Sequence, residues 1–136
     1  MNEYVKQAKD FLESCNATMK IEYLFEDMNK FWKDNVYRNV YRARIKTPLG
    51  VMAVKFWDSA YNTKNKIEPT EYDILACLQK YELGSFEDFA SEFGYDIYDT
   101  DTRWDAKQIY KSSCKEYENV CRCFTDEQIE AMQEIQ

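Results

Sequence analysis

Residues 68–96, EPTEYDILACLQKYELGSFEDFASEFGYD, contain the clearest folding signals of the chain. Thr70 and Asp73 have the spacing of a helix capping box, directly after Pro69. The apolar residues that follow recur at helical spacing, and they are Ile74, Cys77, Leu78 and Tyr81. Because glycine commonly ends helices, the stretch predicts a helix that begins at Thr70 and ends before Gly84.

The same stretch then repeats these signals. Ser85 and Asp88 mark a second helix start, and Gly94 marks its end. A second apolar stripe lies between them and consists of Phe86, Phe89, Ala90 and Phe93. Because only a residue or two separate the two predicted helices, we expect the chain to turn sharply between them.

Two further helices are predicted after this stretch. The longer one begins near Thr102, with Asp105 three positions later, and continues to about Phe124. Its apolar stripe consists of Ala106, Ile109, Tyr110, Ser113, Tyr117, Val120, Cys121 and Phe124. Thr125 with Gln128 begins a short final helix. The second half of the chain is therefore predicted to form a layer of about four helices.

The first half of the chain predicts one helix and a small sheet. Residues 2–15 carry apolar side chains at helical spacing, whereas residues 18–25 alternate with the period of a half-buried strand. Residues 36–46 and 51–57 also alternate, and Thr47-Pro48-Leu49-Gly50 between them suits a type I turn. We expect a three-stranded antiparallel sheet, with one face in the core and one face carrying arginine and lysine.

Two stretches of this half are predicted to be irregular. Residues 26–35 are expected to form a loop or a single helical turn, and residues 59–66 a polar connection. A length of 136 residues corresponds to one domain, residues 1–136, in which the helix and sheet extend to residue 66 and the helical part follows from 67. The predicted fold class is α+β.

Charge is distributed unevenly along the chain, whose net charge is −7. Residues 1–28 hold three basic and six acidic groups, residues 29–66 nine basic and two acidic, and residues 67–136 six basic and seventeen acidic. Such asymmetry indicates a surface that selects partners by charge. The alternative is that a basic sheet packs beside acidic helices and the two neutralise each other.

Composition excludes several classes of protein. The chain has no histidine, which excludes imidazole acid–base catalysis and every zinc site that contains histidine. Its five cysteines are scattered through predicted helices, which favours buried thiols in a reducing cytosol over a disulfide framework. No apolar run approaches the roughly 20 residues that a membrane span needs. We therefore expect a cytoplasmic protein without membrane contact.

The remaining residues offer little for catalysis or metal binding. Cys121 and Cys123 lie near a predicted helix C-terminus, where the helix dipole disfavours a thiolate. Residues 96–103 cluster carboxylates but depart from the EF-hand pattern, because Arg103 is at the fifth position counted from Asp99. We expect no catalytic residue, no metal and no cofactor, and we predict that the chain is not an enzyme.

The predicted hairpin combines cations with aromatic side chains, as a ribbon that contacts phosphates and stacks on bases would. The expected contacts in this alternative are Arg42, Arg44, Lys46 and Trp57. The isoelectric point near 4.7 opposes it, because an acidic protein repels nucleic acid over most of its surface.

The acidic helical half provides the leading candidate site. Its carboxylates would imitate the charge of nucleic acid and bind a positively charged groove on a partner protein. The expected partner-binding residues are Glu87, Asp88, Glu92, Asp96, Asp99 and Asp101. The sequence leaves the oligomeric state open.

The run PTEYDILACLQKYELGSFEDFASEFGYD, followed by TRWDAKQIYKSSCKEYENVCRCFTDEQIEAMQEI, resembles a group of small uncharacterised proteins carried by bacteriophages, prophages and other mobile elements. The resemblance extends into the preceding strand and hairpin and so covers most of the chain. The chain departs from the pattern at the hairpin turn, residues 46–50, and at residues 97–101, where its loop is longer.

The resemblance implies a viral or mobile-element origin and a host bacterial cytosol. Small acidic phage proteins without enzyme signatures are often inhibitors of host machinery, including anti-CRISPR proteins. By this analogy we expect an inhibitor or adaptor that binds a host protein. The expected partner is a nuclease-type defence complex such as CRISPR–Cas.

Overall fold

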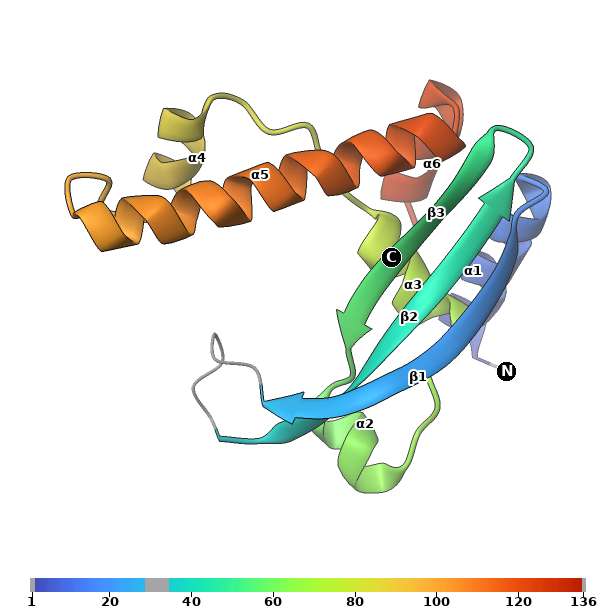
Figure 1. Ribbon diagram of the computed structural model, residues 1–136. Helices are drawn as coiled ribbons and strands as arrows, with labels where there is room; N and C mark the ends of the chain where they lie inside the picture. The colour runs from blue at the N-terminus through green and yellow to red at the C-terminus, as the bar shows by residue number, and fades with distance from the viewer. Residues whose placement is uncertain (1, 29–34, 136) are drawn as a thin grey trace.

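The structure is a computed structural model that describes residues 2–28 and 35–135 (Figure 1). In these residues the predicted α+β fold is confirmed, with helices around one open three-stranded antiparallel sheet. The elements are α1 (Glu3–Ser14), β1 (Thr18–Met28), β2 (Tyr37–Thr47), β3 (Gly50–Trp57), α2 (Ala60–Asn65), α3 (Glu71–Leu78), α4 (Phe86–Glu92), α5 (Thr100–Cys123) and α6 (Asp126–Gln133).

The central strand of the sheet is β2, which pairs antiparallel with β1 and with β3. Pro48 and Leu49 form the turn of the predicted hairpin, and Thr47 lies opposite Gly50. Thr47 is buried, and its hydroxyl donates a hydrogen bond of 2.6 Å to the carbonyl oxygen of Cys123. This bond attaches the hairpin turn to the end of α5.

The main hydrophobic core lies on one face of the sheet, where α1 and α3 cover it (Figure 1). Its most deeply buried members come from α1, β2, α3, α5 and α6 and include Ala8, Leu12, Ala43, Ile45, Ile74, Leu75, Leu78, Val120 and Met132. Because burying one large apolar side chain contributes about 1.5–3 kcal/mol, this cluster is the main source of stability. The opposite face of the sheet carries the charged side chains that the alternation predicts.

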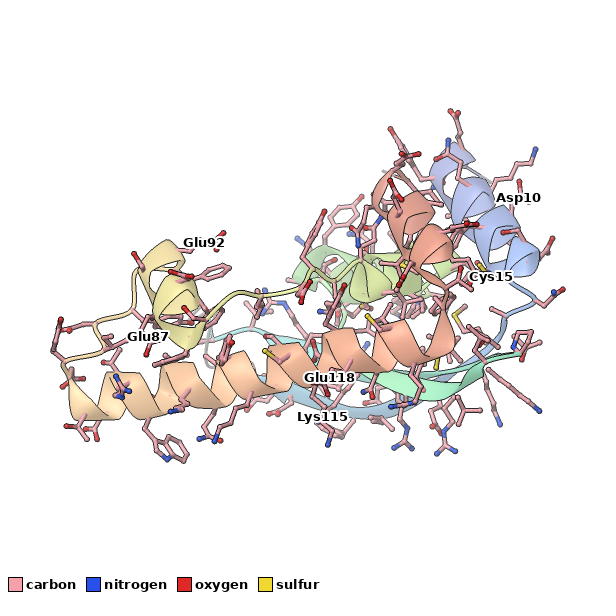
Figure 2. The ribbon with its side chains drawn as sticks, turned by 90° about the horizontal axis from the view of Figure 1, so that it is seen from above. Asp10, Cys15, Glu87, Glu92, Lys115 and Glu118 are labelled. Carbon is pink, nitrogen blue, oxygen red and sulfur yellow. The ribbon has the colours of Figure 1, made fainter. Side chains whose placement is uncertain are left out.

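A second, smaller cluster holds α4 against the first half of α5. Phe86, Phe89 and Ala106 are buried in it. The hydroxyl of Tyr110 also donates a hydrogen bond of 2.5 Å to the carbonyl oxygen of Gly84. Figures 1 and 2 show that this part, residues 83–110, projects away from the sheet. We call it the arm.

The expected polar connection at residues 59–66 is wrong, because most of it is α2. The side chain of Ser59 accepts a hydrogen bond from the backbone N–H of Asn62 and so caps the helix. Lys66 ends it in the left-handed conformation, with φ of 56°. No residue of α2 is buried, so the helix has no apolar stripe by which the sequence could reveal it.

The helix predicted from Thr70 has the expected capping box, but α3 ends at Leu78 and does not continue towards Gly84. The side-chain amide of Gln79 donates hydrogen bonds to the carbonyl oxygens of Met132 and Ile135, at 2.7 and 2.6 Å. These contacts with α6 and the residues after it draw the chain out of the helical path. The expected sharp turn is therefore also wrong, because seven residues, 79–85, connect α3 to α4.

Two element boundaries differ from prediction. The cap of α5 is Asp99, which accepts from the backbone N–H of Thr102, so the helix begins before the expected Thr102. Strand β1 passes a bulge between Tyr23 and Phe25 and continues to Met28. The strand therefore occupies residues 26–28 of the loop that was expected at 26–35. Most of the remaining loop, residues 29–34, lies outside the described residues.

Gly94 ends α4 as predicted, with φ of +74°. Gly94→Ala is expected to lower the free energy of unfolding by about 1–2 kcal/mol, because a side chain disfavours the left-handed conformation. Urea denaturation measures this change. Gly84→Ala is the matched control, because Gly84 lies outside the left-handed region and an added Cβ would approach Asp88 no closer than 3.4 Å. Equal losses in both variants would contradict the assignment.

Candidate interaction surfaces

The predicted nucleic-acid contacts lie on the sheet face that points away from α1 and α3. In the strand register, Arg44 is opposite Lys20 of β1, and Arg42 is opposite Lys55 of β3. Side chains alternate along strands, so these residues share one face with Lys46. We call the set of Lys20, Arg42, Arg44, Lys46 and Lys55 the basic face.

A hollow of about 770 Å³ lies on the basic face beside the hairpin turn. Its lining is mainly apolar, because Val51, Ala53 and the aliphatic stems of the cations contribute to it. The lining residues are Thr18, Met19, Lys20, Arg42, Arg44, Ile45, Lys46, Val51, Met52 and Ala53. We call the apolar part of this lining the floor of the hollow, and its four cations, which are Lys20, Arg42, Arg44 and Lys46, the rim.

Glu22 is the carboxylate that partly neutralises the basic face. One of its oxygens lies 2.7 Å from Nε of Arg42 and 3.0 Å from Nε of Arg44. The hydrogen bond from Arg42, together with the charges of both guanidinium groups, lowers the pKa of this carboxyl. Five cations and one carboxylate leave this group of residues with a net charge of +4.

Glu22→Gln is expected to weaken the acid dependence of stability. The pKa of Glu22 is lower in the folded state, so the ionised carboxyl stabilises the fold above the unfolded-state pKa of about 4.3. That contribution is lost as pH falls through the folded-state pKa. The difference in urea midpoint between wild type and variant should therefore shrink as pH falls from about 5 to about 2. Glu26→Gln, on the same strand, is the control, and an equal pH dependence in both variants would refute the assignment.

Trp57 shares the face but lies at the end remote from the hollow. It is paired with Val40, two residues along β2 from Arg42, and is half-buried. The ammonium of Lys55 lies 4.9 Å from the ring centroid of Phe25 near the same end. The structure thus places all four predicted nucleic-acid contacts on one face, with three of them around the hollow and Trp57 outside it.

The six predicted partner-binding carboxylates all lie in the arm and are all exposed. Two of them also have local structural roles. Asp99 caps α5, and the hydrogen bonds from Thr102 lower its pKa, while Asp96 accepts from the backbone N–H of Tyr98. The arm has few compensating cations, which are Arg103 and Lys107 in its sequence.

The two charged regions do not neutralise each other within the described residues. There, the salt bridges join Glu22 to Arg42 and Arg44, and Lys80 to Glu116 at 3.1 Å. None of these involves a carboxylate of the arm. Among the salt bridges of the described residues, those that neutralise the basic face come from Glu22, which belongs to the sheet itself.

Sequence reasoning missed three exposed aromatic side chains on the arm. Phe93, Tyr98 and Trp104 are 60, 95 and 64% exposed. Phe93 was expected to be buried in the stripe of α4, which is wrong, although its ring lies 5.0 Å from that of Phe89. The sequence contained a signal for the exposure of Trp104, because this residue lies outside the apolar stripe of its helix.

Cysteine chemistry is restricted by burial. Cys15 and Cys123 are buried, and desolvation raises the pKa of both thiols. The placement of Cys121 on an apolar stripe is wrong, because Cys121 is exposed.

In residues 2–28 and 35–135, no group of three or more cysteine or carboxylate side chains is arranged to hold a metal ion. None of the helices in that part has both the length and the apolar character to cross a membrane.

Comparison of the chain with protein-family models, with curated proteins and with solved structures finds no match.

Proposed function

We propose that the chain is a phage-encoded, non-enzymatic inhibitor that binds a host protein through its arm. The partner is a CRISPR–Cas or other nuclease-type defence complex in the host cytosol. Its nucleic-acid groove is basic, and the arm occupies that groove without any cofactor. The resemblance to proteins of mobile elements supports the origin, and the chemistry of the arm supports the mode of binding.

The observation that carries this proposal is the combination of exposed aromatic rings with carboxylates on one projecting element. Trp104 and Tyr98 are largely exposed, and Asp101 and Asp99 lie close to them in the sequence. Tryptophan and tyrosine are enriched among residues that dominate binding energy at protein interfaces. Carboxylates around them supply attraction and orientation towards a basic surface.

A plaque assay tests the proposal. Wild-type protein is expressed in bacteria that carry one defence system each, and the plating of a targeted phage is counted. We expect wild type to raise plaque numbers against at least one nuclease-type system. The arm variant, Glu87→Lys with Glu92→Lys and Asp101→Lys, should lose this effect, because its reversed charges repel a basic groove. These three positions leave the capping residues intact.

The matched control carries the same charge change outside the arm. It combines Glu13→Lys on α1 with Glu130→Lys on α6 and Glu134→Lys at the C-cap of α6, all at exposed positions. We expect this control to protect phage as wild type does. Protection by the arm variant equal to that of the control would contradict docking through the arm.

Nucleic-acid binding by the basic face is the second candidate, and the clustering of cations around the hollow favours it. A mobility-shift assay with a single-stranded oligonucleotide at low salt tests this function. Lys46→Ala should weaken binding of every sequence and reduce the salt slope by about 1, because one phosphate contact is lost. A shift that is absent at low salt, or unchanged by Lys46→Ala, would eliminate it.

A further inference from the structure

We propose that the chain associates with itself head to tail. The loop between α4 and α5 forms the tip of the arm, and the tip of one copy binds in the hollow of the next. One exposed aromatic side chain of the arm enters the hollow, and carboxylates around it contact the cationic rim. This inference concerns a second copy of the chain and does not depend on the proposed host partner.

The hollow has the size and chemistry for such a segment. Its volume of about 770 Å³ lies within the range of roughly 300–1,000 Å³ typical of ligand-binding clefts. The floor includes Val51 and Ala53, while Lys20 and Lys46 are exposed at the rim. An apolar floor with a cationic rim fits an anionic segment that also carries a large apolar side chain.

The tip of the arm has this composition. Tyr98 is 95% exposed in the loop between α4 and α5, with Asp96, Asp99 and Asp101 beside it in the sequence. Tyrosine combines a large apolar ring with a polar hydroxyl, so it can enter an apolar hollow whose rim is polar. The neighbouring carboxylates would then lie where the lysines and arginines of the rim can reach them.

The arm cannot fill the hollow of its own chain, because the two lie at opposite ends of α5. The C-terminal end of this helix contacts the hairpin beside the hollow, where Arg122 donates to the carbonyl oxygen of Val51. The helix has 24 residues and is therefore about 36 Å long. Figures 1 and 2 both place the tip at the end of the molecule remote from the hairpin turn.

A second copy suits the hollow better than nucleic acid does. The net charge of −7 repels both a polyanion and a second copy, but nucleic acid carries a charge at every phosphate, whereas a second copy spreads its charge over a whole domain. The apolar floor also offers a phosphate little, but it favours an aromatic ring. The contact joins two different surfaces, so each added copy leaves one tip and one hollow free.

Sedimentation velocity tests the proposal with purified protein. At about 0.05 M salt, the average mass of wild type should rise with concentration, and at about 0.5 M salt it should return to that of the monomer, because salt screens the rim charges. The hollow variant, Lys20→Glu with Lys46→Glu, should be monomeric at low salt. The arm variant should also be monomeric, because its Asp101→Lys change reverses a charge beside Tyr98. The control variant with changes on α1 and α6 should associate as wild type does.

Mixing the two monomeric variants gives the decisive result. The intact arm of the hollow variant can then bind the intact hollow of the arm variant, so a complex with equal amounts of each variant should form. Circular dichroism and thermal denaturation verify that both variants are folded. Wild type that stays monomeric at low salt, or a mixture that fails to associate, overturns the proposal. A chain that stays monomeric but binds a single-stranded oligonucleotide through Lys20 and Lys46 also overturns it and assigns the hollow to nucleic acid.

Discussion

Phe124→Ala is expected to lower the free energy of unfolding by about 3–5 kcal/mol, a large fraction of the stability of a domain of this size. Phe124 is 1% exposed and is the C-cap of α5, where the helix meets the main core. Its ring stacks on that of Phe11 at a centroid distance of 6.5 Å. Truncation removes this burial and leaves a cavity between α1 and the end of α5.

Urea denaturation followed by circular dichroism measures the effect. Phe93→Ala is the matched control, because it removes the same atoms from a side chain that is 60% exposed on the arm. We expect its unfolding midpoint to change far less than that of Phe124→Ala. Similar losses in the two variants would contradict the location of the core.

The second large effect concerns binding. Replacing Phe93, Tyr98 and Trp104 together by alanine is expected to abolish measurable binding of the defence complex identified by the plaque assay. Aromatic residues at the centre of an interface often contribute about 2 kcal/mol or more each, which corresponds to roughly 30-fold in affinity per residue. Isothermal titration with the purified complex measures the loss.

The control for this variant removes aromatic rings elsewhere on the surface. Tyr61→Ala with Tyr81→Ala is suitable, because these rings are 68 and 67% exposed and lie outside the arm. We expect this control to bind with the affinity of wild type. If both variants lose affinity equally, the aromatic residues of the arm are not the contact.

Local signals predicted much of the fold correctly. The capping box of Thr125 and Gln128 begins α6 as expected, and Ser85 and Gly94 bound α4 as expected. These predictions succeed because a cap needs only residues three or four positions apart in the sequence. The alternation in the hairpin likewise identifies the two faces of β2.

Long-range contacts explain the prediction that failed most clearly. The helix expected to reach beyond Tyr81 ends at Leu78, because Gln79 bonds to carbonyl oxygens more than fifty residues away. The pattern of residues 68–96 cannot predict these bonds, because their acceptors, Met132 and Ile135, lie outside that stretch. The hollow is missed for the same reason, since it exists only where all three strands lie together.

The charges of the candidate sites were predictable, but their separation was not. Composition along the chain reveals a basic centre and acidic flanks, and the structure places the cations of the sheet on one face. It is the length of α5, together with the packing of Phe86 and Phe89 on it, that carries the acidic arm away from that face. The separation leaves both surfaces able to bind other molecules.

The most direct test of the account is the salt dependence of the affinity between the chain and the purified defence complex. Wild type should bind tightly at about 0.05 M salt and much more weakly at about 0.5 M, because the contact joins the carboxylates of the arm to a basic groove. The arm variant, Glu87→Lys with Glu92→Lys and Asp101→Lys, should bind weakly at both concentrations. An affinity that is insensitive to salt and unaffected by these three substitutions would contradict docking through the arm.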